Sequence, residues 1–133
     1  MRNNRTAGHG WELECKSFLK DCLKQAVITT RQGSRALDAM KIDLMSETGR
    51  LEFNFQCKNY AKKLDYDKVL YEMPKNELNI ILHKYTEKKG KRFITKGKFA
   101  IMEIETLYHI LDNYVSNKTG ESHGLTAVNN RKQ

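Results

Sequence analysis

Gln56 and Lys58 stand two residues apart in the segment 51–59, which reads LEFNFQCKN. Apolar and polar residues alternate in this segment, and the alternation predicts a β-strand. Residues two apart in a strand point to the same face of the sheet, so the amide oxygen of Gln56 and the ammonium of Lys58 share one side. The aromatic residues of the segment take the other side, which suits a core. The pattern thus places a possible metal ligand, the amide oxygen of Gln56, beside the positively charged ammonium of Lys58.

Asp43 lies in a second short segment, 40–45, whose alternation also indicates a strand. Turn-forming residues at 46–50 separate the two segments, which predicts a β-hairpin. In such a hairpin Asp43 comes to lie roughly opposite Gln56. Apolar residues flank Asp43 on both sides, so its carboxylate is partly desolvated and needs a partner, for which a divalent cation is one candidate.

This group of side chains suits the hydrolysis of a phosphodiester. Mg²⁺ held by Asp43, the side-chain oxygen of Gln56 and the backbone carbonyl of Cys57 would neutralise the phosphate and lower the pKa of a bound water. Lys58 could orient that water or stabilise the developing negative charge. Mg²⁺ commonly uses only one or two protein carboxylates, which matches this sparse set of ligands.

An ordinary alternative exists for the same residues. An acid and a lysine on adjacent strands are often only a surface ion pair that contributes little to stability. The spacing of Asp43 with Gln56-x-Lys58 is also a loose motif that occurs by chance. The residues alone leave both interpretations open.

The order of these residues along the chain resembles the PD-(D/E)xK nuclease superfamily and, within it, the archaeal-type Holliday junction resolvases. The resemblance covers about residues 5–110. The residues that carry it are Glu12 in a helix that follows Gly8, Arg31 at the end of a strand, Ser34 in a loop, Asp43 in a strand, and Gln56 and Lys58 in the next strand.

The resemblance implies a role for each matching residue. Glu12 matches an acid on the first helix that assists metal binding, and Asp43 matches the metal-binding aspartate. Lys58 matches the motif lysine, Ser34 a serine important for cleavage, and Arg31 a basic residue just before it. It further implies a homodimer that cuts two strands of a four-way junction, with Mg²⁺ or Mn²⁺ as cofactor.

Gln56 departs from the family pattern, which usually has glutamate at this place. A neutral amide oxygen is a weaker Mg²⁺ ligand than a carboxylate, so Glu12 becomes more necessary beside Asp43. Two alternatives to a junction resolvase follow. One is a restriction-like or repair nuclease that acts on another form of DNA, and the other is a DNA-binding module with a degenerate site.

The charge of the chain points to a polyanionic partner. Lys and Arg total 24 against 16 acids, which gives a formal net charge of +8 and a pI near 9.4. Neutralising phosphates releases condensed counterions, so DNA is the expected partner, although a basic surface without a special role is the alternative. The candidate DNA-binding residues are Arg5, Arg31, Arg35, Lys62, Lys63, Lys88 and Lys89.

The predicted elements give a mixed α/β class. The sequence predicts helices near 11–24, 61–73 and 105–115, strands near 26–31, 40–45, 51–59, 78–85 and 98–104, and a loop at 32–39. This order favours a central mixed β-sheet of about five strands flanked by helices, as in restriction endonucleases. One domain of 1–115 and a flexible polar tail of 116–133 are expected.

Three cysteines without a CxxC pair support neither a disulfide framework nor a zinc site. Cys15 and Cys22 fall in an apolar helical stripe and are expected to be small core residues. A reducing, cytoplasmic location follows, because the chain also shows no signal peptide and no apolar run long enough to span a membrane. The four histidines show no ligand spacing, and only His9 is near the candidate site.

Overall fold

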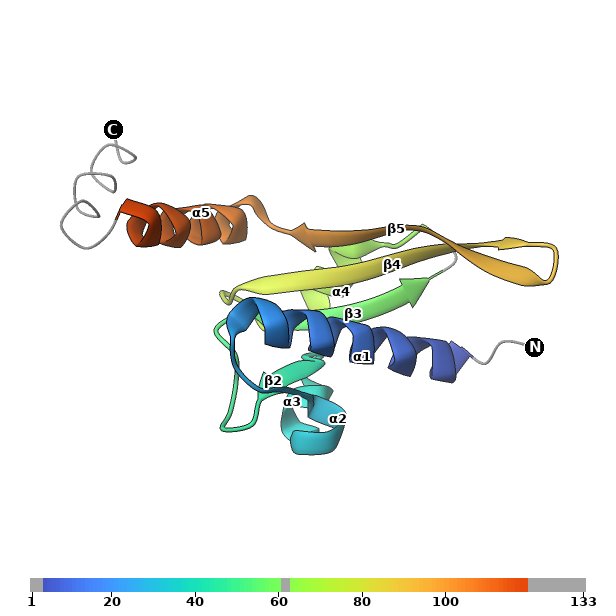
Figure 1. The fold of residues 1–133 in the computed structure, drawn as a ribbon, viewed down its shortest axis with the longest axis horizontal. Coiled ribbons are helices and arrows are strands. Elements are labelled where there is room, and N and C mark those ends of the chain that lie inside the picture. Colours follow the sequence, from blue (N-terminus) through green and yellow to red (C-terminus); the bar gives the residue numbers. More distant parts are fainter. Residues whose placement is uncertain (1–3, 61–62, 120–133) are drawn as a thin grey trace. The chain divides into compact units, whose positions relative to one another are not determined.

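The computed structural model describes residues 4–60 and 63–119 (Figure 1). The chain divides into two compact units between Ile101 and Met102. The class is mixed α/β, as predicted. The first contains every predicted metal ligand, and the second contains the last helix.

The first unit begins with helix α1 (Asn4–Leu23), which packs on two strands, β1 (Val27–Thr29) and β3 (Asn54–Tyr60). Trp11, Cys15 and Leu19 are buried, and their spacing of four residues puts them on one helix face. The indole N–H of Trp11 donates a hydrogen bond of 2.9 Å to the carbonyl of Leu82, which ties the helix to the sheet.

The other half of the predicted apolar stripe of α1 is not core. Phe18 is 64% exposed, Leu23 is 38% exposed and Cys22 is exposed as well. The prediction that Cys22 is a core residue is therefore wrong. The reason is geometric, because the side of α1 that carries Phe18 faces an open groove next to the sheet and not another element.

Five strands form two sheets within the described residues. β1 pairs antiparallel with β2 (Leu44–Ser46), while β3 pairs in parallel with β4 (Asn79–Lys89), which is followed at the sheet edge by β5 (Arg92–Met102). The predicted hairpin between the segments 40–45 and 51–59 is wrong, because β2 takes β1 as its partner. A single backbone hydrogen bond of 2.7 Å, from Asp43 N–H to the Phe55 carbonyl, links the two sheets.

The segment 32–39, predicted to be a loop, forms two short helices, α2 (Thr30–Gly33) and α3 (Arg35–Ala39). The Ser34 side chain accepts a hydrogen bond of 3.2 Å from Leu37 N–H and so caps the start of α3. Leu37 packs with Ile42 and Met45 in a small core. Helices this short fall below the window in which helical periodicity can be recognised.

Helix α4 (Tyr66–Glu72) connects β3 to β4 and is capped by Asp65, whose side chain accepts a hydrogen bond from Lys68 N–H. It is shorter than the predicted helix at 61–73. Leu64 and Met73 flank it and pack on the fully buried Ile81 of β4. This cluster covers the sheet face that Ile81 presents.

The second unit contains helix α5 (Ile104–Thr119). The helix extends four residues past the predicted end at 115, so residues 116–119 are helical and not part of a tail. The rest of the predicted tail, 120–133, lies outside the described residues. No helix in the described part of the chain is long and apolar enough to cross a membrane.

Candidate metal centre

Asp43 lies where the two sheets meet and is held by its neighbours on β3. Its side chain is buried, and one carboxylate oxygen, Oδ2, accepts two hydrogen bonds. Cys57 N–H donates at 2.6 Å and the Gln56 side-chain nitrogen donates at 3.1 Å. The predicted proximity of Asp43 and Gln56 is therefore confirmed, although a contact between two sheets produces it and not a hairpin.

The surroundings of Asp43 disfavour its negative charge. Burial raises the pKa of this carboxyl from 3.8 to about 7, against the lowering effect of the Cys57 N–H. The charge of Glu12 raises the pKa further, and the charge of Lys58 lowers it. Both charges act on Asp43 because both side chains lie near it.

Glu12 brings a second buried carboxylate from α1. Its exposed fraction is 5%, which is rare for a glutamate. The Arg31 guanidinium lies 3.3 Å from one oxygen, Oε1. The other oxygen, Oε2, is buried and accepts no hydrogen bond, although His9 Nδ1 lies 3.6 Å away. Half of this carboxylate is therefore available to a further cation.

Gln56 presents a second buried oxygen without a hydrogen-bond donor. Its amide nitrogen is used by Asp43, and its amide oxygen, Oε1, is buried and unpaired. A buried acceptor without a donor costs about 1–3 kcal/mol. One of the two unpaired oxygens thus belongs to Gln56, which is hydrogen-bonded to Asp43, and the other to Glu12, whose charge acts on Asp43.

Lys58 completes the group on the same face of β3 as Gln56, as strand alternation predicts. Its side chain is half-buried, and its ammonium lies 5.6 Å from the centre of the Tyr60 ring. In β4 the residue opposite Lys58 is His83. His83 is buried and its Nε2 has no hydrogen-bond partner, and burial lowers the pKa of its imidazole.

We call Glu12, Asp43 and Gln56 the oxygen cluster. Two carboxylates and one amide oxygen are hard donors, which suit Mg²⁺ or Mn²⁺ better than zinc. Among the described residues no three His, Cys, Asp or Glu side chains gather into a metal-binding group, so the cluster depends on the glutamine oxygen. The two unpaired oxygens, Oε2 of Glu12 and Oε1 of Gln56, are donors of the kind that a hard divalent cation binds. The Cys57 carbonyl stays a predicted ligand.

The Cys57 thiol belongs to the other side of β3, next to Cys15 of α1. A hydrogen bond between the two thiols and burial raise the pKa of Cys57 well above its usual value. Both cysteines and Cys22 are free.

Two residues near the cluster have local roles that the sequence did not indicate. Arg31 was predicted to bind DNA, and it also pairs with Glu12. His9, which was predicted to lie near the site, stands three residues before Glu12 on α1, a spacing that brings helical side chains together. Ser34 caps α3, which is a structural role and leaves its predicted part in cleavage a prediction.

The other described residues that were predicted to bind DNA lie exposed on other elements of the first unit. Arg35 is exposed on α3, and Lys63 is exposed after β3. Lys88 and Lys89 are exposed at the end of β4. The Arg5 side chain and all of Lys62 lie outside the described residues.

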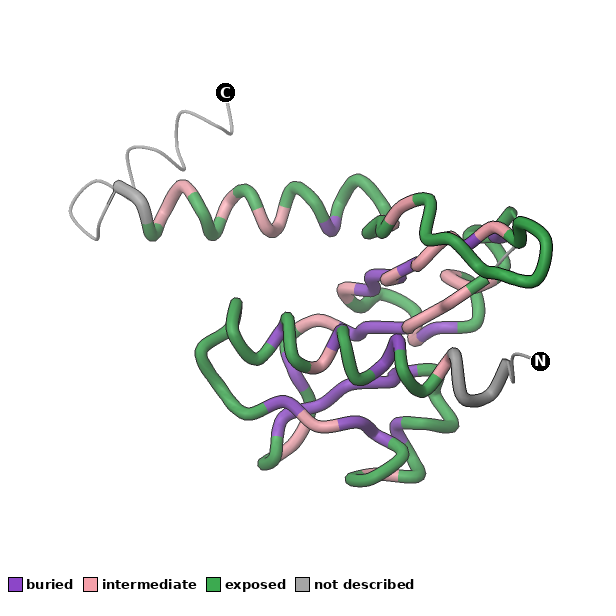
Figure 2. Tube along the Cα trace, turned by 45° about the vertical axis from the view of Figure 1, so that its right-hand side comes forward, coloured by how far each residue is buried: buried purple, intermediate pink, exposed green. Residues whose placement is uncertain are grey.

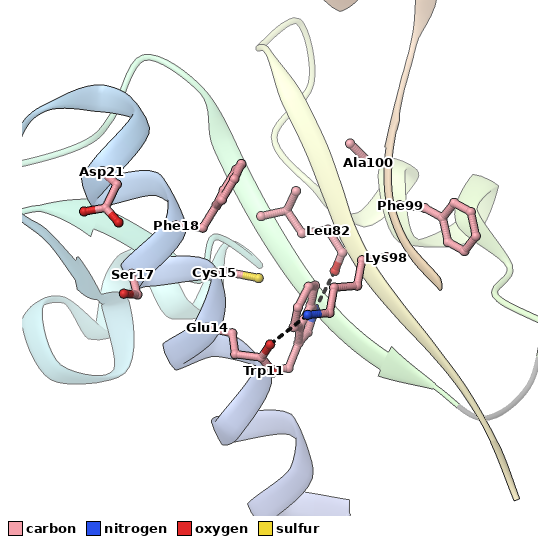
Figure 3. Close-up of a pocket in the computed structure, with 10 residues that line it drawn as sticks. All are labelled: Trp11, Glu14, Cys15, Ser17, Phe18, Asp21, Leu82, Lys98, Phe99 and Ala100. Atoms are coloured by element: carbon pink, nitrogen blue, oxygen red, sulfur yellow. Dashed lines mark hydrogen bonds and ion pairs between the residues drawn. The ribbon is translucent and has the colours of Figure 1, made fainter. Parts of the chain in front are cut away.

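A groove of about 550 Å³ lies between α1 and the strands β4 and β5 (Figure 3). Trp11, Phe18, Leu82 and Phe99 give it mainly apolar walls. Its charged Glu14 is already neutralised, because Lys84 and Lys98 lie 2.9 and 3.1 Å from the carboxylate and lower its pKa. The groove therefore lacks the unsatisfied polar groups found in the oxygen cluster.

Comparison with known proteins adds no relative, since no family model, curated protein or solved structure matches the chain.

Proposed function

We propose that the protein is a metal-dependent nuclease that hydrolyses phosphodiester bonds of DNA at the oxygen cluster. One observation carries the proposal: buried Asp43 is hydrogen-bonded to Gln56, the charge of buried Glu12 acts on Asp43, and buried oxygens of Glu12 and Gln56 have no hydrogen-bond donor. Burying two acids together is unfavourable unless a cation compensates. Arg31 compensates Glu12 only in part, because it lies against one oxygen.

Glu12, Asp43 and Gln56 would hold Mg²⁺ or Mn²⁺, and the bound ion supplies charge neutralisation at the phosphate and activation of a water. The residues of the chain would stabilise the developing charge and orient the ligands. Lys58 stands on the same strand face as Gln56, where its ammonium stabilises negative charge that develops on the phosphate oxygens. Hydrogen bonds from Cys57 N–H and the Gln56 amide hold the Asp43 carboxylate in one orientation.

A DNA substrate is supported by the net charge of +8, which is large for 133 residues. The resemblance to Holliday junction resolvases favours a four-way junction as the substrate and a homodimer as the active form. A restriction-like or repair nuclease would act on linear duplex or another branched form, and a degenerate module would bind DNA without cutting it.

Cleavage assays test the proposal. The wild-type protein and the variants Asp43→Ala and Lys58→Ala are incubated with a synthetic four-way junction, or a linear duplex of the same sequence, in Mg²⁺ or Mn²⁺. We expect Asp43→Ala to lose at least about 10³-fold and Lys58→Ala at least about 10²-fold in rate. Asp67→Asn removes an exposed acid of α4 and serves as the matched control.

The result also chooses between the alternatives. Faster cutting of the junction than of the duplex supports a resolvase, and the reverse supports the restriction-like or repair interpretation. Normal cleavage by both Asp43→Ala and Lys58→Ala would reject the mechanism. DNA binding with no metal-dependent cleavage by the wild type would favour the degenerate module.

A further inference from the structure

The strands β4 and β5 form a two-stranded ribbon at residues 87–96, which we call the basic ribbon. The pairing of β3 with β4 ends at Tyr60 and Tyr85, so β4 continues past its partner. A tight turn at Gly90, with φ of 62°, joins β4 to β5. Thr86 is the last buried residue of β4, and none of the residues 87–96 is buried (Figure 2).

Half of the net charge of the chain lies in these ten residues. Five of them are basic and one is acidic, which gives +4 against +8 for the whole chain. The single acid, Glu87, lies 3.8 Å from Lys96. The remaining four basic residues are Lys88, Lys89, Lys91 and Arg92, and all are exposed.

Such a ribbon is an unfavourable structure without a partner. A two-stranded hairpin with no covering element is marginally stable in water, and its like charges repel one another. It also exposes apolar surface, since Phe93 and Ile94 are 37% and 38% accessible. A polyanion would compensate the charge, and an enclosing groove would cover the apolar side chains.

We propose that the basic ribbon enters the major groove of duplex DNA, where its lysines and arginine contact the phosphates on the rims of the groove. The major groove of B-form DNA is wide enough for a two-stranded β-ribbon. The major groove of A-form RNA is too narrow for side chains to enter, so the shape of the ribbon selects DNA. This inference rests on the proposed DNA substrate and adds a contact outside the oxygen cluster.

The ribbon and the cluster reach different parts of the substrate. Ile81 stands opposite Gln56, and Lys88 follows seven residues later on β4. At about 3.3 Å per strand residue, the two positions are separated by roughly 23 Å. That distance corresponds to about seven base pairs of duplex. The ribbon therefore binds flanking duplex and not the phosphate that is cut.

The test replaces three lysines of the ribbon by glutamine in the variant K88Q/K89Q/K91Q. The variant K20Q/K68Q/K75Q is the matched control, because it removes the same charge from exposed sites on α1, on α4 and after α4. Binding to a labelled duplex of about 20 base pairs, roughly two helical turns, is measured by fluorescence anisotropy in EDTA. EDTA prevents cleavage, so binding is read independently of the proposed chemistry.

We expect the wild type and the control variant to depend on salt in the same way. Raising the salt concentration from about 50 to 200 mM should weaken DNA binding by both proteins. The factor by which the affinity falls should be about 40 times smaller for K88Q/K89Q/K91Q than for the wild type, since three phosphate contacts are lost. The charge-preserving variant K88R/K89R/K91R should retain wild-type binding. Thermal unfolding of each variant verifies that it is folded.

Equal salt dependence of K88Q/K89Q/K91Q and the wild type would overturn the proposal. Equal affinity of the wild type for duplex RNA of the same sequence would also overturn it, because groove entry requires the B form. If the ribbon passes both tests while no metal supports cleavage, the nuclease proposal fails and the ribbon proposal stands.

Discussion

The oxygen cluster and the basic ribbon are opposite in nearly every physical respect. The cluster is acidic and buried, and its side chains are positioned by α1, the Asp43 linkage and β3. The ribbon is basic and exposed, and it is formed by the pairing of two strands, with an ion pair between Glu87 and Lys96. The acids of the cluster would repel DNA if they were exposed at the surface, whereas the ribbon carries the attractive charge at a distance.

In the proposed nuclease, the attraction of DNA and the metal chemistry would therefore lie in separate parts of the first unit. A buried carboxylate contributes little to the long-range field when Arg31 and a divalent cation compensate it. An exposed lysine contributes to that field but cannot organise a cation. We therefore expect substitutions in the two regions to affect different kinetic constants.

The largest effect should come from the cluster. Glu12→Gln and Asp43→Asn should lower kcat for DNA cleavage by about 10³-fold or more and change KM for DNA little. K88Q/K89Q/K91Q should raise KM for DNA far more than it lowers kcat, because it weakens binding away from the reacting phosphate. Steady-state kinetics with a junction substrate measure both constants. A drop in kcat from the ribbon variant as large as that from Asp43→Asn would contradict the separation.

The next effect concerns stability in EDTA. The pKa of Asp43 is about 7 in the folded protein, whereas an ordinary aspartate, as in the unfolded chain, has a pKa of 3.8. Folding therefore favours the protonated form. The resulting stability is fully present below about pH 4 and is lost as pH rises through 7. Between pH 5 and 8 the wild type should lose roughly 3 kcal/mol more than Asp43→Asn. Urea unfolding at each pH measures this difference, and parallel curves would show that Asp43 is not desolvated.

The glutamine offers a way to strengthen the cluster. Gln56→Glu adds a carboxylate in place of the unpaired amide oxygen, so Mn²⁺ should bind at least about tenfold more tightly. In EDTA the same variant should be less stable, because three acids then share one buried site. Metal titration and thermal unfolding test the two halves of this prediction. Weaker metal binding by the variant would place the ion away from Gln56.

The smallest effect separates a structural from a catalytic role for Ser34. Ser34→Ala should lower stability by about 1 kcal/mol, because α3 loses its cap. Ser34→Asn keeps a capping oxygen and should restore that stability. If Ser34→Asn is stable but cuts DNA poorly, the hydroxyl has the part in cleavage that the family resemblance implies. Full cleavage by Ser34→Asn would leave the cap as its role.

Short-range rules predicted the strand face that carries the site. Alternation along β3 was enough to put Gln56 and Lys58 together, and the burial of Asp43 between apolar neighbours was predicted in the same way. The pairing partner of β2 was not predictable by those rules. It depends on β1 and on one hydrogen bond from Asp43 to Phe55, and sequence spacing does not specify either contact.

Two other differences between the prediction and the structure arise because a local sequence pattern does not show which surfaces another element covers. The apolar stripe of α1 predicted a fully covered helix face, but the sheet covers only the part that carries Trp11, Cys15 and Leu19. The strands of the ribbon lack a buried face, so their sequence shows no apolar alternation, and the predicted strands at 78–85 and 98–104 leave residues 87–96 out. A pattern that arises from burial cannot reveal a segment that is exposed on both faces.

The binding of Mn²⁺ tests the central claim most directly. Electron paramagnetic resonance counts the ions bound to the wild type, to Asp43→Asn and to the control Asp67→Asn. We predict one tightly bound ion per chain in the wild type and in the control, and none in Asp43→Asn. Equal binding by Asp43→Asn and the wild type, or no tight binding by the wild type, would contradict a metal centre at the oxygen cluster.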